Sequence, residues 1–220
     1  MAVTNGDKVI RGRWGPLCVL LLCGLSSISA VQPKGIVGRA APPWHVDSWV
    51  QIPAGVADPE VGKFRGKVIC LYGFQSWCPG CHSKGFPTLQ QLIKRFDGED
   101  DVIFVAVQTT FEGFGSNTPA KALETAKQYD LNIPIGHSGT SGNPSKLMRN
   151  YRTGGTPWTI IIDRNGVVRF NDFHITQDAG HALITHWTGT LESRNLQSRN
   201  LESSDNQIWP LRQPLPTTSH

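Results

Sequence analysis

The sequence predicts an α/β fold in which helices flank a mixed central sheet, parallel in one part and antiparallel in another. Two continuous apolar runs, Val68–Phe74 and Val102–Val107, have the length of strands buried on both faces. Apolar residues then recur every three or four positions, which is typical of amphipathic helices. Asn165-Gly166 lies between two later apolar runs and indicates a hairpin. Strands joined through helices pair in parallel, whereas hairpin strands pair antiparallel.

The first half of the domain is predicted as two strands, a helix and a further strand. A short strand is expected within Trp44–Ile52, before the buried strand Val68–Phe74. After Cys81 the spacing of apolar residues becomes helical, and Gly98 ends this helix. Pro87 lies inside the helix and should bend it.

The second half begins with helices and ends with the hairpin and a closing helix. Thr118-Pro119 is a helix cap followed by proline at the first helical position, and Asn143-Pro144 repeats this signal. Strands are expected at Trp158–Asp163 and Val167–Phe170, and an amphipathic helix covers 179–187.

The two ends of the chain differ from the domain at 44–189. Residues 1–30 combine a basic start with the apolar run Leu17–Leu25 and small residues, and predict a signal peptide or an uncleaved N-terminal anchor. Residues 31–43 are expected to form a linker, and 190–220 a disordered low-complexity tail. We therefore expect an exported protein, periplasmic or otherwise extracytoplasmic, that meets the membrane only through its N-terminal segment, and only if that segment is uncleaved.

Composition narrows the possible partners of this 220-residue chain. The net charge of +4 is mild and no dense block of Lys or Arg occurs, so nucleic acid is not expected as a partner. Two of the five cysteines, Cys18 and Cys23, lie in the predicted signal segment. The three that remain are too few for a disulfide scaffold. Cys70 lies within an apolar strand and is expected to be a buried core thiol.

The run Trp77-Cys78-Pro79-Gly80-Cys81 carries the chemistry of the chain. Pro79 and Gly80 suit a turn from a strand into the first turn of a helix. An exposed cysteine at a helix N-terminus faces unpaired amides, which should lower its pKa and make it a nucleophile. Disulfide exchange, haem attachment through Cys-x-x-Cys-His and metal binding all remain open at this point.

With these elements in place, the chain resembles the thioredoxin-fold superfamily from about Phe64 to Trp187. It is most similar to bacterial exported thiol–disulfide oxidoreductases and redoxin-type, peroxiredoxin-like proteins. The resemblance rests on the strand before the cysteines, on Cys78-Pro-Gly-Cys81, on Pro87 and on Gly155-Thr-Pro157 before a late strand. It implies a thioredoxin-like three-layer sandwich and no cofactor.

The resemblance also implies the roles of individual residues. Cys78 attacks a substrate disulfide, Cys81 resolves the mixed disulfide, and the two form a redox-active disulfide. Thr156-Pro157 matches the family's cis-proline, whose backbone binds an extended substrate beside the cysteines, with Trp77 packed over the site. The expected partners are protein thiols or disulfides and an upstream electron donor or acceptor.

The chain departs from its relatives near the second cysteine. Relatives often place Glu three residues after it, where this chain has Lys84, so the usual acid is absent there. His82 is a candidate for proton transfer in its place, the alternative being an exposed surface histidine. Pro87 is six residues after Cys81 where relatives usually show five, which predicts an extra residue at the start of the helix.

Other functions stay open beside the favoured one. In a peroxiredoxin-like thiol peroxidase, Cys81 would attack peroxide. A c-type cytochrome would attach haem through Cys78, Cys81 and His82. Copper binding by the cysteines and a histidine is a further alternative. A structural zinc site is not expected, because no second cysteine pair exists.

Overall fold

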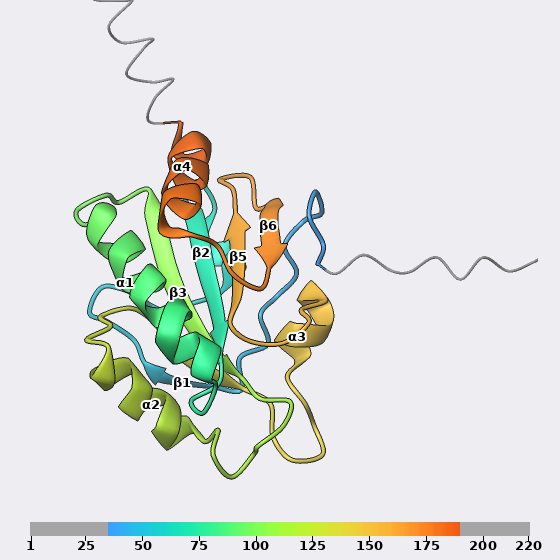
Figure 1. The fold of residues 1–220 in the computed structure, drawn as a ribbon. Coiled ribbons are helices and arrows are strands. Elements are labelled where there is room, and N and C mark those ends of the chain that lie inside the picture. Colours follow the sequence, from blue (N-terminus) through green and yellow to red (C-terminus); the bar gives the residue numbers. More distant parts are fainter. Residues whose placement is uncertain (1–34, 190–220) are drawn as a thin grey trace, which may run out of the picture. The chain divides into compact units, whose positions relative to one another are not determined.

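Residues 35–189 are the part of the chain described by this computed structural model, and they form a six-stranded sheet covered by helices (Figure 1). The strands lie in the order β1-β4-β3-β2-β5-β6. β2, β3 and β4 run parallel, while the β1–β4, β2–β5 and β5–β6 pairs are antiparallel. The mixed sheet predicted from the sequence is confirmed. The strands are β1 Ser48–Gln51, β2 Val68–Phe74, β3 Val102–Thr109, β4 Ile135–Ser138, β5 Trp158–Ile162 and β6 Val168–Asp172.

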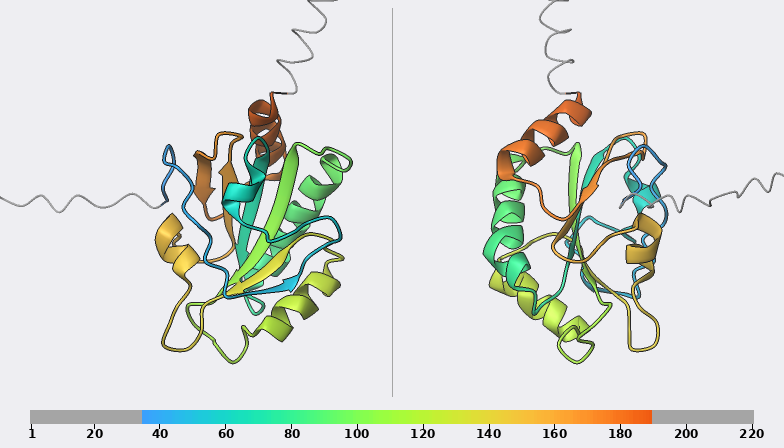
Figure 2. Two further views of the ribbon diagram at one scale, coloured as in Figure 1. Left: turned by 180° about the vertical axis from the view of Figure 1, so that it is seen from behind. Right: turned by 45° about the vertical axis from the view of Figure 1, so that its right-hand side comes forward.

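The helices make the outer two layers of a three-layer sandwich. α1, α2 and α4 cover one face of the sheet, and the short α3 lies against the other face (Figure 2). A π-helical turn precedes α1, and a 3-10 helix precedes β2. The helices are α1 Phe86–Arg95, α2 Pro119–Gln128, α3 Lys146–Tyr151 and α4 Gln177–Thr188; the π turn is Cys81–Gly85 and the 3-10 helix Val61–Phe64.

β2 lies in the middle of the sheet and is buried along its whole length, as its apolar sequence predicts. Its side chains alternate between the two faces. Cys70 and Tyr72 enter the core under α1 and α4, whereas Ile69 and Leu71 enter the opposite core with Trp44. The side of β2 that carries Tyr72 is therefore the side covered by the helix that follows the cysteines.

Two elements differ from the sequence-based expectation. β4 is not predicted, because its four residues Ile-Gly-His-Ser show neither an apolar run nor strict alternation. α3 begins after Ser145, whose hydroxyl accepts the backbone N–H of Met148 at 3.4 Å. The helix start expected at Asn143-Pro144 is therefore wrong, and Asn143 instead forms a tight bridge with Thr140.

The chain ends lie mostly outside the described residues. This holds for the segment expected as a signal peptide or anchor, residues 1–30, and for the expected tail, residues 190–220. The described part of the expected linker packs against the domain: Ile36 is buried, and Ala40 forms a β-bridge with Val167. No helix within 35–189 has the length and apolarity needed to span a bilayer.

Candidate active site

The pairing of β2 with β5 brings two distant segments of the chain together. These strands run antiparallel with Gly73 opposite Trp158, so the end of β2 lies beside the start of β5. Cys78 follows the end of β2, and Pro157 immediately precedes β5. As a result, the Cys78 sulfur lies 3.5 Å from the carbonyl oxygen of Thr156.

Cys78 occupies the junction between the strand and the helical turn. The backbone N–H of Cys81 points at the carbonyl oxygen and the sulfur of Cys78, at 3.1 and 3.3 Å. Cys78 is 6% exposed, so the expectation of an exposed cysteine is wrong. The segment at Thr156 lies over it and leaves only a small part open to solvent.

Cys81 lies one turn further in and has no exposed surface. Burial raises its pKa to about 12, and a hydrogen bond to Cys78 acts in the same direction. Cys81 is therefore a thiol at neutral pH. Cys70 is also buried, and burial raises its pKa to about 12, which confirms the expected core thiol. All three cysteines are free in this structure.

The peptide bond between Thr156 and Pro157 is cis, the geometry that the resemblance implies. Pro157 packs closely against the turn that carries the cysteines. A methyl group at Gly80 would lie 3.2 Å from Cδ of Pro157, and one at Gly85 would lie 3.1 Å from its Cβ. Glycine at both positions lets the proline ring approach the turn. The role of this segment in binding substrate stays a prediction.

Trp77 presents an apolar surface immediately before Cys78. It is 46% exposed, more than any other aromatic residue within the described residues 35–189. Its indole nitrogen lies against the loop after β3, because a methyl group at Gly113 would come within 2.9 Å of it. The ring is thus supported from one side and open to solvent on another, and its expected contact with substrate stays a prediction.

His82 is half-buried, with both ring nitrogens engaged. Nε2 lies 2.7 Å from the carbonyl oxygen of Ser76, and Nδ1 lies 2.8 Å from the hydroxyl of Tyr129. A carbonyl only accepts, so Nε2 carries the proton in the neutral ring and Nδ1 accepts from Tyr129. The ring therefore holds the start of the helix against the end of β2 and the end of α2. Its expected part in proton transfer stays a prediction.

The extra residue expected before Pro87 is accommodated by the π-helical turn. The N–H of Phe86 donates to the carbonyl of Cys81, five residues earlier, which takes one residue more than an α-helical turn. Pro87 lies at the start of α1, immediately after the π turn and within the continuous helical run that begins at Pro79. Proline has no N–H to donate to the preceding turn, and the irregular π turn lies where that hydrogen bond is missing. The expected bend of the helix at Pro87 stays a prediction.

Sequence reasoning missed a polar network behind the site. Gln108 donates to the Ser76 hydroxyl at 2.6 Å, and the Ser76 N–H donates to Asn117 at 2.8 Å. Nδ1 of His137 lies 2.6 Å from the Gln108 side-chain oxygen, and burial lowers the pKa of this histidine. These residues lie at or just beyond the carboxyl ends of the parallel strands. Polar residues at such strand ends were the signal that could have found them.

Across residues 35–189, no three His, Cys, Asp or Glu side chains gather into a group that would hold a metal ion. Neither ring nitrogen of His82 is free to act as an axial haem ligand without breaking the bonds described above.

The fold and the site are those of the thioredoxin fold, with a cysteine pair after the central strand and a cis-proline before the neighbouring one. A family model described as Redoxin matches residues 52–179. The chain belongs to the redoxin family.

Solved structures give the same picture. A thioredoxin-like superfamily protein is 29% identical, with a TM-score of 0.62 over 68% of this chain and 96% of that one. A thiol-disulfide isomerase from Corynebacterium glutamicum is 26% identical, with a TM-score of 0.60 over 69% of this chain and 96% of its own. No curated protein matches the chain. The chain is thus an oxidoreductase of the thiol–disulfide class.

Proposed function

We propose that the chain is an exported enzyme that exchanges electrons with protein disulfides through Cys78 and Cys81. The unequal environment of the two sulfurs carries this proposal. Cys78 keeps a small exposed surface and receives the N–H of Cys81, whereas Cys81 is wholly buried with a pKa raised to about 12 by burial. One sulfur is placed to meet a substrate and the other to meet only its neighbour.

The reaction in the reducing direction has two steps. The Cys78 thiolate attacks one sulfur of a substrate disulfide, forms a mixed disulfide and releases the other sulfur as a thiolate. Cys81 then loses its proton and attacks the Cys78 sulfur. The bond from Cys78 to the substrate breaks, the substrate leaves as a second thiolate, and the protein keeps a Cys78–Cys81 disulfide. Two electrons pass to the substrate, and an upstream thiol donor restores the dithiol.

The surface around Cys78 suits an extended peptide. Trp77 offers an exposed aromatic face on one side, and the Thr156-Pro157 segment lies on the other. Aromatic faces contribute large contact area at low conformational cost, and the backbone of a segment before a strand can hydrogen-bond to an added strand. We therefore assign Trp77, Thr156 and Pro157 to substrate binding, with protein disulfides as the substrate class.

Cysteine variants test the assignment. Cys78→Ser should abolish reduction of insulin disulfides, whereas Cys81→Ser should accumulate mixed disulfides with substrate. Cys70→Ala is the matched control, because Cys70 is equally buried but lies outside the site, and it should keep the activity of the parent. Full activity in Cys78→Ser would refute the proposal, and so would mixed disulfides that form on Cys70.

The alternatives fit the site less well. A peroxidase would need Cys81 as an accessible thiolate, but Cys81 has no exposed surface and a raised pKa. A haem-bearing site would need a free His82, whose nitrogens are both engaged. A visible haem band in the purified protein, or rapid peroxide turnover lost only in Cys81→Ser, would contradict the proposed activity.

Export is part of the proposal and rests on residues 1–30. Their basic start, apolar run and small residues have the order of a signal peptide. Fusion of this segment to a reporter that is active only outside the cytoplasm should give activity. Replacing Leu20 and Leu21 with charged residues should abolish it, and mass analysis of the mature chain distinguishes cleavage from anchoring.

A further inference from the structure

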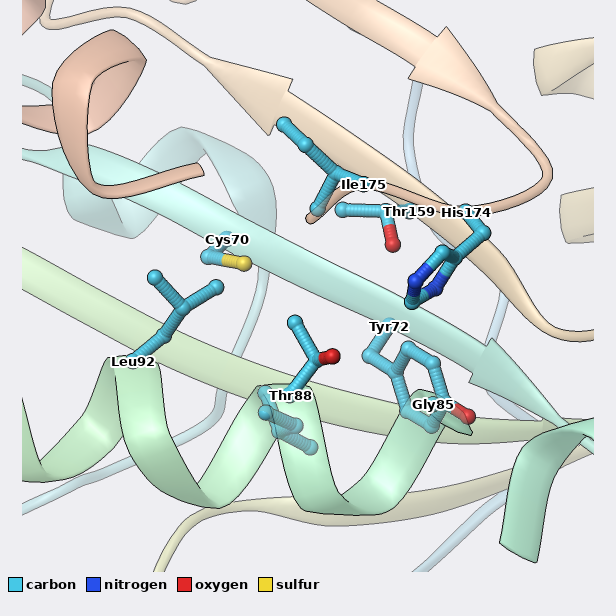
Figure 3. Close-up of a pocket in the computed structure, with 9 residues that line it drawn as sticks. Cys70, Tyr72, Gly85, Thr88, Leu92, Thr159, His174 and Ile175 are labelled. Carbon is cyan, nitrogen blue, oxygen red and sulfur yellow. The ribbon is translucent and has the colours of Figure 1, made fainter. Parts of the chain in front are cut away.

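Tyr72 has a buried hydroxyl that lacks a nitrogen or oxygen partner in the described part of the chain. The residue is 2% exposed and projects from β2 toward the helix that follows the cysteines (Figure 3). Its hydroxyl abuts the backbone of Gly85 so closely that any side chain there would overlap it. Leaving a hydroxyl buried and unpaired costs free energy, so its retention needs a physical reason.

The hydroxyl lies against the turn that carries Cys81. Gly85, which the hydroxyl abuts, ends the π turn that Cys81 begins, and Tyr72 and Cys81 belong to the same buried cluster and interact electrostatically. Burial raises the pKa of both groups; the hydroxyl, as a donor to the sulfur, raises the pKa of Tyr72 further and acts to lower that of Cys81. Within the described residues the Tyr72 hydroxyl completes no hydrogen bond, and the backbone N–H of Cys81 points at the Cys78 sulfur.

The other titratable groups around this pair come from each neighbouring element. Cys78 lies on the same turn and Tyr129 at the end of α2. His174, in the connection from β6 to α4, shares a small cavity with Tyr72, and burial and the charge of Lys84 lower its pKa. Within residues 35–189, no carboxylate is named among the groups that shift the pKa of Tyr72 or Cys81. The Tyr72 hydroxyl is a neutral side-chain donor that lies against the turn carrying the buried sulfur.

We propose that Tyr72 stabilises the Cys81 thiolate during the second step of disulfide exchange. This inference rests on the proposed function. The Cys81 proton leaves to a solvent base, the thiolate attacks Cys78, and the substrate departs as a thiolate, while Tyr72 stays neutral and donates its O–H to the sulfur. A donor interacts more strongly with a charged sulfur than with a thiol, so the contact favours the transition state over the resting dithiol.

Single-turnover kinetics separate the two steps. The full chain is used with Cys18→Ser and Cys23→Ser, so that Cys70, Cys78 and Cys81 remain. Reduced protein reacts with an aromatic disulfide that releases a coloured thiolate: the first release reports attack by Cys78, and the second reports resolution by Cys81. Tyr72→Phe should leave the first release unchanged and slow the second by about tenfold, as for loss of a hydrogen bond to a charged group. The rate of the second release increases with pH, and in Tyr72→Phe this increase should occur at a higher pH than in the parent.

Tyr151→Phe is the matched control. Tyr151 is a buried tyrosine on the opposite face of the sheet, where its hydroxyl donates to the carbonyl of Pro42 at 2.7 Å. Its loss should lower stability but leave both release rates unchanged. An unchanged second release in Tyr72→Phe, or equal slowing in the two variants, would overturn the inference. Absence of the first release in the parent would instead refute the proposed function.

Discussion

Replacing Gly85 with alanine should destabilise the protein, although alanine is the better helix former. The added methyl group would overlap the Tyr72 hydroxyl and lie 3.1 Å from Cβ of Pro157. The Tyr72 ring is blocked on one side, because it packs edge-on against Phe86 with the centroids 5.3 Å apart. Pro157 is held by its neighbours in the chain, because the Thr156 carbonyl contacts Cys78 and β5 begins at Trp158.

The size of the effect follows from two opposing contributions. Overpacking a well-packed core costs about 1–3 kcal/mol, and here the overlap involves a rigid ring rather than a flexible chain end, so the upper part of that range applies. Exchange of glycine for alanine in a helix stabilises by about 1 kcal/mol. The net loss is about 2 kcal/mol, which lowers Tm by about 4–8 °C in a domain of this size.

Urea unfolding followed by tryptophan fluorescence measures this loss. Gly62→Ala is the control, because Gly62 lies in the 3-10 helix with no atom within 4 Å of an added methyl group, and its free energy of unfolding should change by less than about 0.5 kcal/mol. Adding Tyr72→Phe to Gly85→Ala removes the overlapping hydroxyl and should recover about 1 kcal/mol. A Gly85→Ala variant as stable as the parent would refute this packing argument.

Two further predictions concern the histidines. Burial lowers the pKa of His137 in the folded chain, so the unfolded chain binds more protons between that pKa and the ordinary value of 6.5. Stability should be full above about pH 6.5 and fall as the pH falls toward the folded pKa; urea unfolding at several pH values should show this fall, and His137→Gln should reduce it. His82→Phe keeps the ring but loses the bonds to Ser76 and Tyr129, and should cost about 1–2 kcal/mol of unfolding free energy. A loss of activity with a shifted pH profile and unchanged stability would instead assign His82 to proton transfer.

The parts of the site that could be predicted are those fixed by short stretches of sequence. Cys78 and Cys81 are three residues apart, so any helical turn places them together. Thr156-Pro157 could be placed beside them only through the resemblance, because neither segment alone determines the register of β2 against β5. The displaced Pro87 indicated an extra residue, and the π turn immediately before α1 holds one residue more than an α-helical turn.

The parts that could not be predicted depend on packing between distant elements. β4 is short and ends in His137 and Ser138, whose polar side chains are satisfied only after β3 and the loops come together. From the sequence, Tyr72 cannot be distinguished from the apolar residues of a buried strand. Because side chains alternate along a strand, Tyr72 and Leu71 are expected on opposite faces of the sheet, but the strand alone does not indicate that the helix after Cys81 covers the face of Tyr72. The burial of Cys78 by Thr156 is hidden for the same reason.

Cys78 and Cys81 differ in burial, and this difference determines which residues can change the rates of the two proposed steps. The burial that raises the pKa of Cys81 to about 12 keeps it from meeting a substrate first, so exposure alone orders the two proposed steps. The same burial opposes the second step, which needs Cys81 as a thiolate. Two groups act to lower the pKa of Cys81, the backbone of Gln75 and the hydroxyl of Tyr72. A backbone donor is present whatever the sequence, whereas the hydroxyl depends on one side chain. The rate of substrate release is therefore expected to depend on Tyr72, a residue behind the cysteine motif rather than within it.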